Sequence, residues 1–348
     1  MGSQPFVSFV TPFYNTRQYL AECIESVLRQ SYQNWEYILV DNQSTDGSSE
    51  IASRYASQCA KIRLVRTDRF FTQVENYNSA LALISPQSRY CKIVQADDWI
   101  YPECLERMVA VAESDDSVGI VSSYRLKGSR LMGAGLRYPQ TVMTGREVCR
   151  LQLTTPLFVF GTPTTVLYRS AIVRETVPFY DEEAFFDDSV ACYRVLRSWN
   201  LGFVHQVLSY SRADDESIRA KVQDFGPDIL ERFLQLSKFG PDYLEKPELT
   251  RALSQAKALY YQFLAWTALT KNSSAFWRFH RSILTSWGMR FERRLVAKYL
   301  FLEVFRLVTN PGTTCKRIIS RLQPAHTVEA PGEKEPRVPP ARDSLARP

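Results

Sequence analysis

The sequence predicts an α/β fold in which helices flank a mostly parallel sheet, followed by a helical extension. Three observations support this prediction. Short apolar runs alternate with segments of helical periodicity up to about residue 220, which is the pattern of a doubly wound sheet. Polar clusters at residues 11–15, 41–47 and 95–98 directly follow three of the apolar runs. Beyond about residue 222, long helical stretches rich in Leu, Phe, Tyr and Trp take over.

The first elements can be assigned in order along the chain. Residues 5–10 form an apolar run that indicates a buried strand, and residues 17–31 follow with apolar positions at helical spacing. The apolar face of this helix consists of Leu20, Cys23, Ile24, Val27 and Leu28. The same reasoning predicts strands at residues 37–40, 62–65 and 91–95, with helices at residues 48–58 and 74–84 between them. Because parallel strands end at the same edge of a sheet, the three polar clusters are expected to meet there.

The alternation continues as far as residue 210. The pattern predicts, in order, a helix at 103–114, a strand at 118–124, a helix after 145, strands at 166–168 and 202–210, and a helix at 189–199 before the last strand. We therefore expect a sheet domain over residues 1–221 and a helical region over 222–322. Residues 323–348 are rich in Pro, Arg and Glu and poor in apolar side chains, so we expect them to be disordered.

Composition limits the class of protein and its compartment. The seven cysteines are scattered and form no Cys-x-x-Cys pair, which argues against a disulfide framework and against structural zinc. No signal-peptide pattern begins the chain, and no window approaches the ~18–20 apolar residues of a membrane span. We expect a cytoplasmic protein. The net charge of +6 is modest and no nucleic-acid-binding module is recognisable, so no nucleic-acid partner is expected.

Two adjacent carboxylates, Asp97 and Asp98, directly follow the apolar strand that contains Ile93. Like charges side by side repel each other, and a divalent cation would relieve that repulsion. Oxygen ligands at a strand end suit Mg²⁺ or Mn²⁺ carrying a diphosphate. The alternative is a polar turn that caps the next helix, with Pro102 in its first turn.

Together the polar blocks resemble those of the family 2 inverting glycosyltransferases, which have the nucleotide-sugar-binding GT-A fold. The matching blocks, in order, are residues 9–15, 40–47, 74–80, 94–102 and 186–188. The resemblance extends over roughly residues 5–220. Departures occur at Asn42 and Gln43, where the family often has Asp and Gly. Gln95 stands where many members carry the first Asp of an Asp-x-Asp motif.

The resemblance implies a nucleotide site at the first two strand ends and the following helix. In the family the loop after the first strand contacts the nucleotide, and because Tyr14 lies in that loop at a strand end we expect its ring to lie against the base. Asp41 matches the family acid that hydrogen-bonds the base, and its carboxylate can accept from the ring N–H of uracil. The residues it assigns to the nucleotide are Thr11, Pro12, Tyr14, Asp41, Asn76 and Ala96. The alternatives are a core position for Tyr14, a turn role for Asp41 and simple helix capping around Asn76.

The resemblance also implies the residues that act on the sugar and on the diphosphate. It assigns the cation, Mn²⁺ or Mg²⁺, to Asp97, and the sugar or diphosphate to Gln95, Asp98 and Arg212. Asp214 departs from the pattern, because relatives often have a metal- or diphosphate-binding His there, and its carboxylate is expected to be a second ligand of the cation. Asp188, with Asp187 as second choice, matches the carboxylate that deprotonates the acceptor hydroxyl during a single inverting displacement. The alternative for this pair is an N-terminal helix cap, which a base role does not exclude.

Basic residues dominate positions 288–321, where apolar residues interleave at helical spacing. Such helices suit an anionic membrane surface, and the alternative is an ordinary helical region with a solvated basic face. We therefore expect a metal-dependent inverting glycosyltransferase that uses a nucleotide-diphosphate sugar, with UDP as the expected nucleotide. Its acceptor is expected to be a saccharide or lipid-linked saccharide in polysaccharide assembly, at the inner face of a membrane. The alternative is a catalytically silent nucleotide-sugar-binding or scaffold protein.

Overall fold

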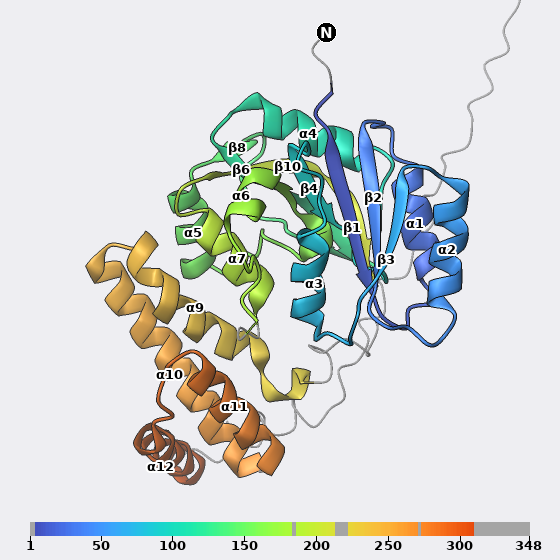
Figure 1. Ribbon diagram of the computed structural model, residues 1–348. Helices are drawn as coiled ribbons and strands as arrows, with labels where there is room; N and C mark the ends of the chain where they lie inside the picture. The colour runs from blue at the N-terminus through green and yellow to red at the C-terminus, as the bar shows by residue number, and fades with distance from the viewer. Residues whose placement is uncertain (1–3, 183–185, 213–221, 271–272, 310–348) are drawn as a thin grey trace, which may run out of the picture.

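The computed structural model describes residues 4–182, 186–212, 222–270 and 273–309. These residues contain a 10-stranded sheet with helices on both faces and a group of helices beyond it (Figure 1). The first elements are β1 (Val7–Phe13), α1 (Leu20–Leu28), β2 (Trp35–Asp41), α2 (Ser48–Gln58), β3 (Ile62–Arg66), α3 (Gln73–Leu81) and β4 (Tyr90–Ile93). The next are β5 (Trp99–Ile100), α4 (Cys104–Ser114), β6 (Val118–Lys127), β7 (Arg130–Met132), β8 (Val142–Met143), α5 (Gly145–Thr154), the 3₁₀ turn η1 (Pro163–Thr165), β9 (Leu167–Arg169), α6 (Ser170–Glu175), α7 (Asp187–Val195) and β10 (Asn200–Ser211).

The strands are ordered β3-β2-β1-β4-β9-β6-β10-β5, with β7 beside β6 and β8 beside β10. Strands β3, β2, β1 and β4 form a parallel block. The chain winds outward from β1 through β2 to β3, then crosses back over β1 to form β4. The winding therefore changes direction between β1 and β4, which is where doubly wound sheets bind their ligands.

Strand β9 differs from the expectation of a parallel sheet, because it runs antiparallel to both of its neighbours, β4 and β6. The turn η1 explains this direction. Thr164 in η1 lies at the carboxyl end of β4, where its Oγ1 accepts a hydrogen bond of 3.0 Å from the backbone N–H of Gln95. The chain enters β9 from that end of the sheet, so β9 must run against β4.

Strand β1 continues beyond its predicted end at residue 10, through Thr11 and Pro12 to Phe13. Its ladder with β2 extends to the last of these residues, whereas its ladder with β4 stops at Val10. The backbone N–H and C=O groups of the even-numbered residues of β1 point toward β4, because the carbonyl of Val10 accepts the backbone N–H of Val94. The backbone nitrogen of Pro12 therefore points to the side of β1 where the ladder with β4 has already ended. A proline fits there because no hydrogen bond from its missing N–H is needed.

Two hydrophobic clusters lie on opposite faces of the sheet. Phe9 and Leu39 belong to a cluster with α1 and α4, whereas Val10 and Ile38 belong to a cluster with α3 and α7. Neighbouring residues of one strand point to opposite faces because side chains alternate along a β-strand. Apolar runs without alternation, as in β1 and β2, therefore indicate strands that are covered on both faces.

The C-terminal helices lie beside the sheet domain and continue from the layer that contains α5 (Figure 1). They are α9 (Pro227–Tyr243), α10 (Lys246–Thr270), α11 (Ser274–Ser286) and α12 (Arg293–Thr309), after the 3₁₀ turn η2 (Gln223–Phe225). Phe239 of α9 stacks on Tyr193 of α7, with ring centroids 4.7 Å apart. Together with the sheet, these helices confirm the predicted α/β class and helical extension.

Within the described residues, none of the helices combines the length and the apolar character needed to cross a membrane. The cysteines of the described residues are all free thiols, and most of them are buried. The domain boundary predicted at residue 221 and the tail predicted at residues 323–348 lie outside the described residues.

Candidate active site

Three polar segments meet at the carboxyl edge of the parallel block. Residues 11–15 end β1, residues 41–47 follow β2 and residues 95–98 follow β4. Phe13, the last residue of β1, pairs with Asp41, the last residue of β2. The backbone N–H of Asn42 donates to the carbonyl of Phe13 at 2.9 Å. The topology therefore gathers these segments at the point where the winding of the sheet changes direction.

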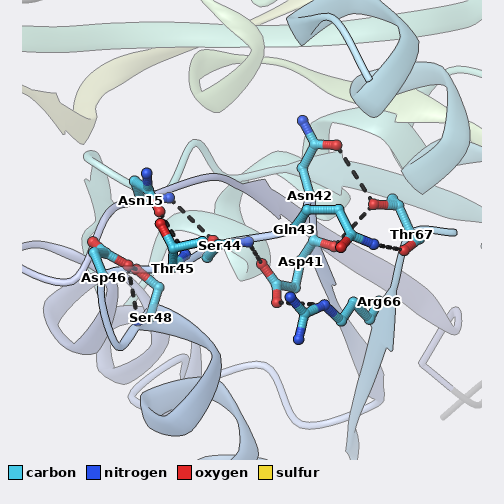
Figure 2. Close-up of polar contacts among 10 residues, drawn as sticks. All are labelled: Asn15, Asp41, Asn42, Gln43, Ser44, Thr45, Asp46, Ser48, Arg66 and Thr67. Atoms are coloured by element: carbon cyan, nitrogen blue, oxygen red, sulfur yellow. Dashed lines mark hydrogen bonds and ion pairs between the residues drawn. The ribbon is translucent and has the colours of Figure 1, made fainter. Parts of the chain in front are cut away.

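Asp41 presents one unsatisfied carboxylate oxygen inside the protein. Its side chain is fully buried. Its Oδ1 accepts the backbone N–H of Ser44 at 2.9 Å (Figure 2). Its Oδ2 is buried and has no hydrogen bond, since the nearest cation, Nε of Arg66, is 3.8 Å away. A buried acceptor without a donor is costly, so this oxygen suits a ligand N–H.

The two residues that depart from the family pattern tie the loop after β2 to the loop after β3. The side-chain amide of Asn42 donates to the carbonyl of Phe71 at 2.9 Å and accepts the Phe71 N–H at 2.8 Å. Gln43 donates from Nε2 to the carbonyl of Thr67 (Figure 2). Gln43 has a φ of 64°, in the left-handed region where a glycine is unstrained. The hydrogen bonds of Asn42 and Gln43 therefore stabilise the shape of this loop. Where relatives have Asp-Gly at these positions, the glycine adopts the same left-handed backbone without strain.

An exposed aromatic pair lies at the same edge. Tyr14, just beyond β1, is 45% exposed and meets Phe70, which is 56% exposed, with ring centroids 4.8 Å apart. Exposed and paired in this way, Tyr14 does not have the core position that was its alternative. In contrast, the hydroxyl of Thr11 is buried, 2.7 Å from the Tyr37 hydroxyl and donating to the Val94 carbonyl at 2.7 Å. The neighbouring Pro12 is buried within β1.

Helix α3 brings a second unsatisfied oxygen to this region. Thr72 and Glu75 form a reciprocal capping box at its start, so the carboxylate of Glu75 is engaged by the helix itself. Asn76 is buried, and its Oδ1 has no hydrogen bond. Asn78 exchanges two hydrogen bonds with the backbone of Tyr180, at 2.9 and 2.8 Å. Capping is thus done by Thr72 and Glu75, which leaves the Asn76 amide available to another group.

The turn at residues 95–98 follows β4, which ends at Ile93. Asp98 is buried and accepts the Ser211 hydroxyl at 3.1 Å, and Ser211 in turn receives Nη1 of Arg125 at 3.3 Å. Burial, and then the charge of neighbouring Asp97, raise the pKa of Asp98 to about 7. Asp97 is only half buried, and Ala96 between it and Gln95 is buried. Asp98 is therefore held by the protein, and Asp97 is the more accessible carboxylate.

Tyr77 of α3 links this turn to the second acidic pair. Its hydroxyl accepts hydrogen bonds from Nε2 of Gln95 at 2.9 Å and Nε2 of Gln73 at 3.0 Å. Burial raises the pKa of Tyr77, and the nearby charges of Asp187 and Asp97 raise it further. Since both carboxylates act on the same phenol, the structure brings the end of β4 and the start of α7 into one region.

Asp187 and Asp188 form the first turn of α7. Burial, and then the charge of Asp188, raise the pKa of Asp187 to about 8. Asp188 Oδ1 accepts the backbone N–H of Ser189 at 2.7 Å. At neutral pH this shift favours the protonated form of Asp187. The raised pKa makes the start of α7 a candidate site for acid–base chemistry.

Arg212, expected near the diphosphate, forms an ion pair with Glu22 of α1 and lies over the ring of Tyr19, 4.4 Å from its centroid. Its Nε is buried without a hydrogen bond. Asp214, the second predicted metal ligand, lies outside the described residues. Among the residues that the structure describes, no three His, Cys, Asp or Glu side chains are grouped to hold a metal ion.

Residues 8–176 match the model of the family described as glycosyl transferase family 2. This domain belongs to glycosyl transferase family 2. The family 2 domain is 32% identical over 118 residues to glycosyltransferase GlyG of Streptococcus pneumoniae serotype 4, a match that covers 34% of this chain and 38% of GlyG. Across three curated relatives, the chain spans 38% to 50% of their length.

Solved structures show that the fold is shared over most of the chain. Residues 1–349 of TarS of S. aureus, in complex with UDP, have a TM-score of 0.56 at 16% identity, and the match covers 81% of this chain and 80% of that TarS fragment. Mannosyltransferase PcManGT from Pyrobaculum calidifontis, in complex with GDP-Man and Mn²⁺, has a TM-score of 0.52 at 18% identity, covering 88% and 87%. These likenesses confirm the GT-A prediction for the family 2 domain.

Sequence reasoning missed several residues of this region. The sequence assigns no individual role to Phe70 or Tyr77, although Tyr77 lies inside the matching block at residues 74–80. For Phe70 a signal existed, because the Phe70-Phe71 pair follows the third strand at the same sheet edge. Arg125, Ser211 and Thr164 carried no local signal, since each reaches the region from a distant strand or turn.

Proposed function

We propose that the protein is an inverting glycosyltransferase that moves a sugar from a nucleotide-diphosphate donor, UDP-linked, to a saccharide or lipid-linked acceptor. The observation that carries this proposal is the buried, unsatisfied Oδ2 of Asp41 at the β2 strand end. The ring N–H of uracil is a donor of the right kind for it, as is that of guanine, whereas cytosine and adenine present acceptors at the corresponding ring positions. UDP in TarS and GDP-Man in PcManGT are both compatible with this feature.

Each cluster of side chains has a distinct task in this mechanism. Asp41 reads the base, and the ring of Tyr14 together with that of Phe70 lies against it. The free amide oxygen of Asn76 accepts a hydrogen bond from the bound nucleotide. The raised pKa of Asp187 favours its protonated form, so Asp188 is the carboxylate that accepts the proton of the acceptor hydroxyl. That oxygen attacks the anomeric carbon opposite the diphosphate, the glycosidic bond to the diphosphate breaks, and the configuration inverts.

The donor set at the end of β4 fits a hard divalent cation, Mn²⁺ or Mg²⁺. Asp97 offers a half-buried carboxylate and Asp98 a buried one beside it, and oxygen ligands of this kind suit these ions. Asp97 would hold the ion, with Asp214 as second ligand. When bound, the ion stabilises negative charge on the departing diphosphate. The protein's own contribution there is to hold Asp98 in place through Ser211 and Arg125.

Donor hydrolysis and transfer with Mn²⁺, compared between wild type and Asp97→Ala, test the proposed function. Since the ion contributes several kcal/mol of transition-state stabilisation, we expect turnover to fall at least about 100-fold. The matched control is Asp116→Ala, whose side chain is 93% exposed and lies away from the site. Unchanged metal-dependent turnover in Asp97→Ala would overturn the role of Asp97.

One observation favours a second candidate, a nucleotide-sugar-binding protein without turnover. Gln95 replaces a carboxylate of the usual motif, and its amide is engaged by Tyr77. Loss of that charge weakens the acidic site relative to other members of the family. Isothermal titration that detects UDP binding, together with no turnover across a panel of donors and acceptors, would select this candidate.

A further inference from the structure

Helix α12 carries a stripe of exposed apolar side chains, which we name the α12 stripe: Phe301, Val304, Phe305 and Val308. Their exposed fractions are 70%, 42%, 57% and 75%. The spacing i, i+3, i+4, i+7 places them on one helical face. Scattered exposed apolar residues are normal on protein surfaces, whereas a contiguous stripe of this kind marks an interaction surface.

The opposite face of α12 is also apolar. Leu295, Val296 and Tyr299 pack against the hydrophobic cluster that extends from the α3 and α7 face of the sheet into the C-terminal helices. A helix that is apolar on both sides is normally enclosed, yet no residue of α12 is buried. Figure 1 shows α12 at the outer end of the helical group, remote from the sheet. Within the described residues, α12 is therefore covered on one side only.

The surroundings of the stripe are cationic. Residues 290–309 contain five basic and two acidic side chains. Both acids are neutralised by ion pairs, Glu292 with Lys257 at 2.6 Å and Glu303 with Arg306 at 2.9 Å. The remaining cations form no ion pair with a carboxylate in the part of the chain that the structure describes; they are Arg290, Arg293, Arg294 and Lys298. On the helical wheel, Arg294 and Lys298 fall on the same outward side as Phe301 and Phe305.

We propose that α12 docks this protein on an anionic lipid surface, with the α12 stripe entering the acyl boundary and the flanking cations among the headgroups. Charge decides between this occupant and a second copy of the chain. Two copies meeting through the stripe bring their cations together, whereas anionic lipid neutralises them. Exposed Phe beside Arg and Lys is also the composition of helices that lie in the membrane interface. This inference is independent of the proposed catalytic function.

Co-sedimentation of the full-length protein with vesicles tests the proposal. Wild type is expected to bind vesicles that contain phosphatidylglycerol, to bind phosphatidylcholine vesicles weakly, and to lose binding at high salt. The double variant Phe301→Ser/Phe305→Ser should weaken partitioning by about tenfold for each Phe. Arg294→Gln/Lys298→Gln should weaken it by about fivefold for each charge. Donor hydrolysis in solution should be unchanged in both variants.

Two matched controls remove the same chemistry elsewhere. Leu131→Ser removes an exposed apolar side chain of β7, and Arg54→Gln/Arg107→Gln removes two exposed charges from α2 and α4. Both controls should bind vesicles as wild type does. The proposal is overturned if wild type ignores phosphatidylglycerol, or if either α12 variant binds like wild type. It is also overturned if sedimentation shows a dimer that Phe301→Ser/Phe305→Ser dissociates while no vesicle binding occurs.

Discussion

Replacing Asp41 with asparagine isolates the hydrogen bond proposed to read the base. In the variant, the amide oxygen can keep the bond from the Ser44 N–H that Oδ1 makes now at 2.9 Å. The amide NH₂ then occupies the position of Oδ2, which is buried and has no donor. A uracil N–H would meet a donor instead of an acceptor. The ion pair with Arg66 at 3.8 Å is also lost, but Arg66 is 53% exposed and such a pair contributes little.

The magnitude follows from the burial of this oxygen. A hydrogen bond to a charged group contributes about 1.5–3 kcal/mol. At about 1.4 kcal/mol for each factor of ten, the Kd for UDP should rise about 10- to 150-fold. Cytosine presents a ring acceptor where uracil presents N–H, so the asparagine should bind CDP better than the aspartate does. The ratio of UDP to CDP affinity is therefore expected to collapse.

Isothermal titration with UDP, CDP and GDP in the presence of Mn²⁺ measures these changes directly. Asp68→Asn is the matched control, because it removes an exposed acid from the neighbouring loop after β3. Thermal unfolding of both variants verifies that the loop remains intact. The reasoning fails if Asp41→Asn binds UDP as tightly as wild type, or if UDP and CDP weaken equally. A preference for GDP over UDP in wild type would retain the role of Asp41 and reassign the donor nucleotide.

Two further predictions concern the acidic pair and the helical region. Asp188→Asn should lower kcat about 10²–10⁴-fold with little change in the donor KM, while Asp187→Asn should cost less; the reverse ranking in steady-state kinetics would exchange their roles. Burial lowers the pKa of His280 in α11 to about 4 from its ordinary 6.5, so between pH 6.5 and 4 the unfolded chain binds a proton that the folded chain does not. The free energy of unfolding should therefore decrease as the pH is lowered from 6.5 to 4, by up to about 3 kcal/mol. Urea unfolding of His280→Gln should lack this part of the pH dependence.

Much of the fold was predictable because it depends on local patterns. The helix at residues 48–58 was predicted with the bounds that the structure has, and the other early elements agree to within a few residues. Helix boundaries and apolar periodicity are set by neighbouring residues. Placing the polar clusters at one sheet edge required only the rule that parallel strands end together. The antiparallel β9 escaped prediction because its direction depends on a contact between Thr164 and Gln95, 69 positions apart.

The sequence by itself determined the family, the strand-and-helix alternation and the candidate acids Asp41, Asp97 and Asp188. Only the tertiary structure showed that Asp41 is buried with one oxygen unsatisfied, and that the Tyr77 hydroxyl accepts from Gln95 while the charges of Asp187 and Asp97 lie near it. It also showed that the apolar stripe of α12 faces outward rather than into a core. Burial and unsatisfied hydrogen bonds are relations between distant segments, and no local pattern encodes them. The residue types follow from the sequence, whereas their availability to a ligand follows from how the segments pack.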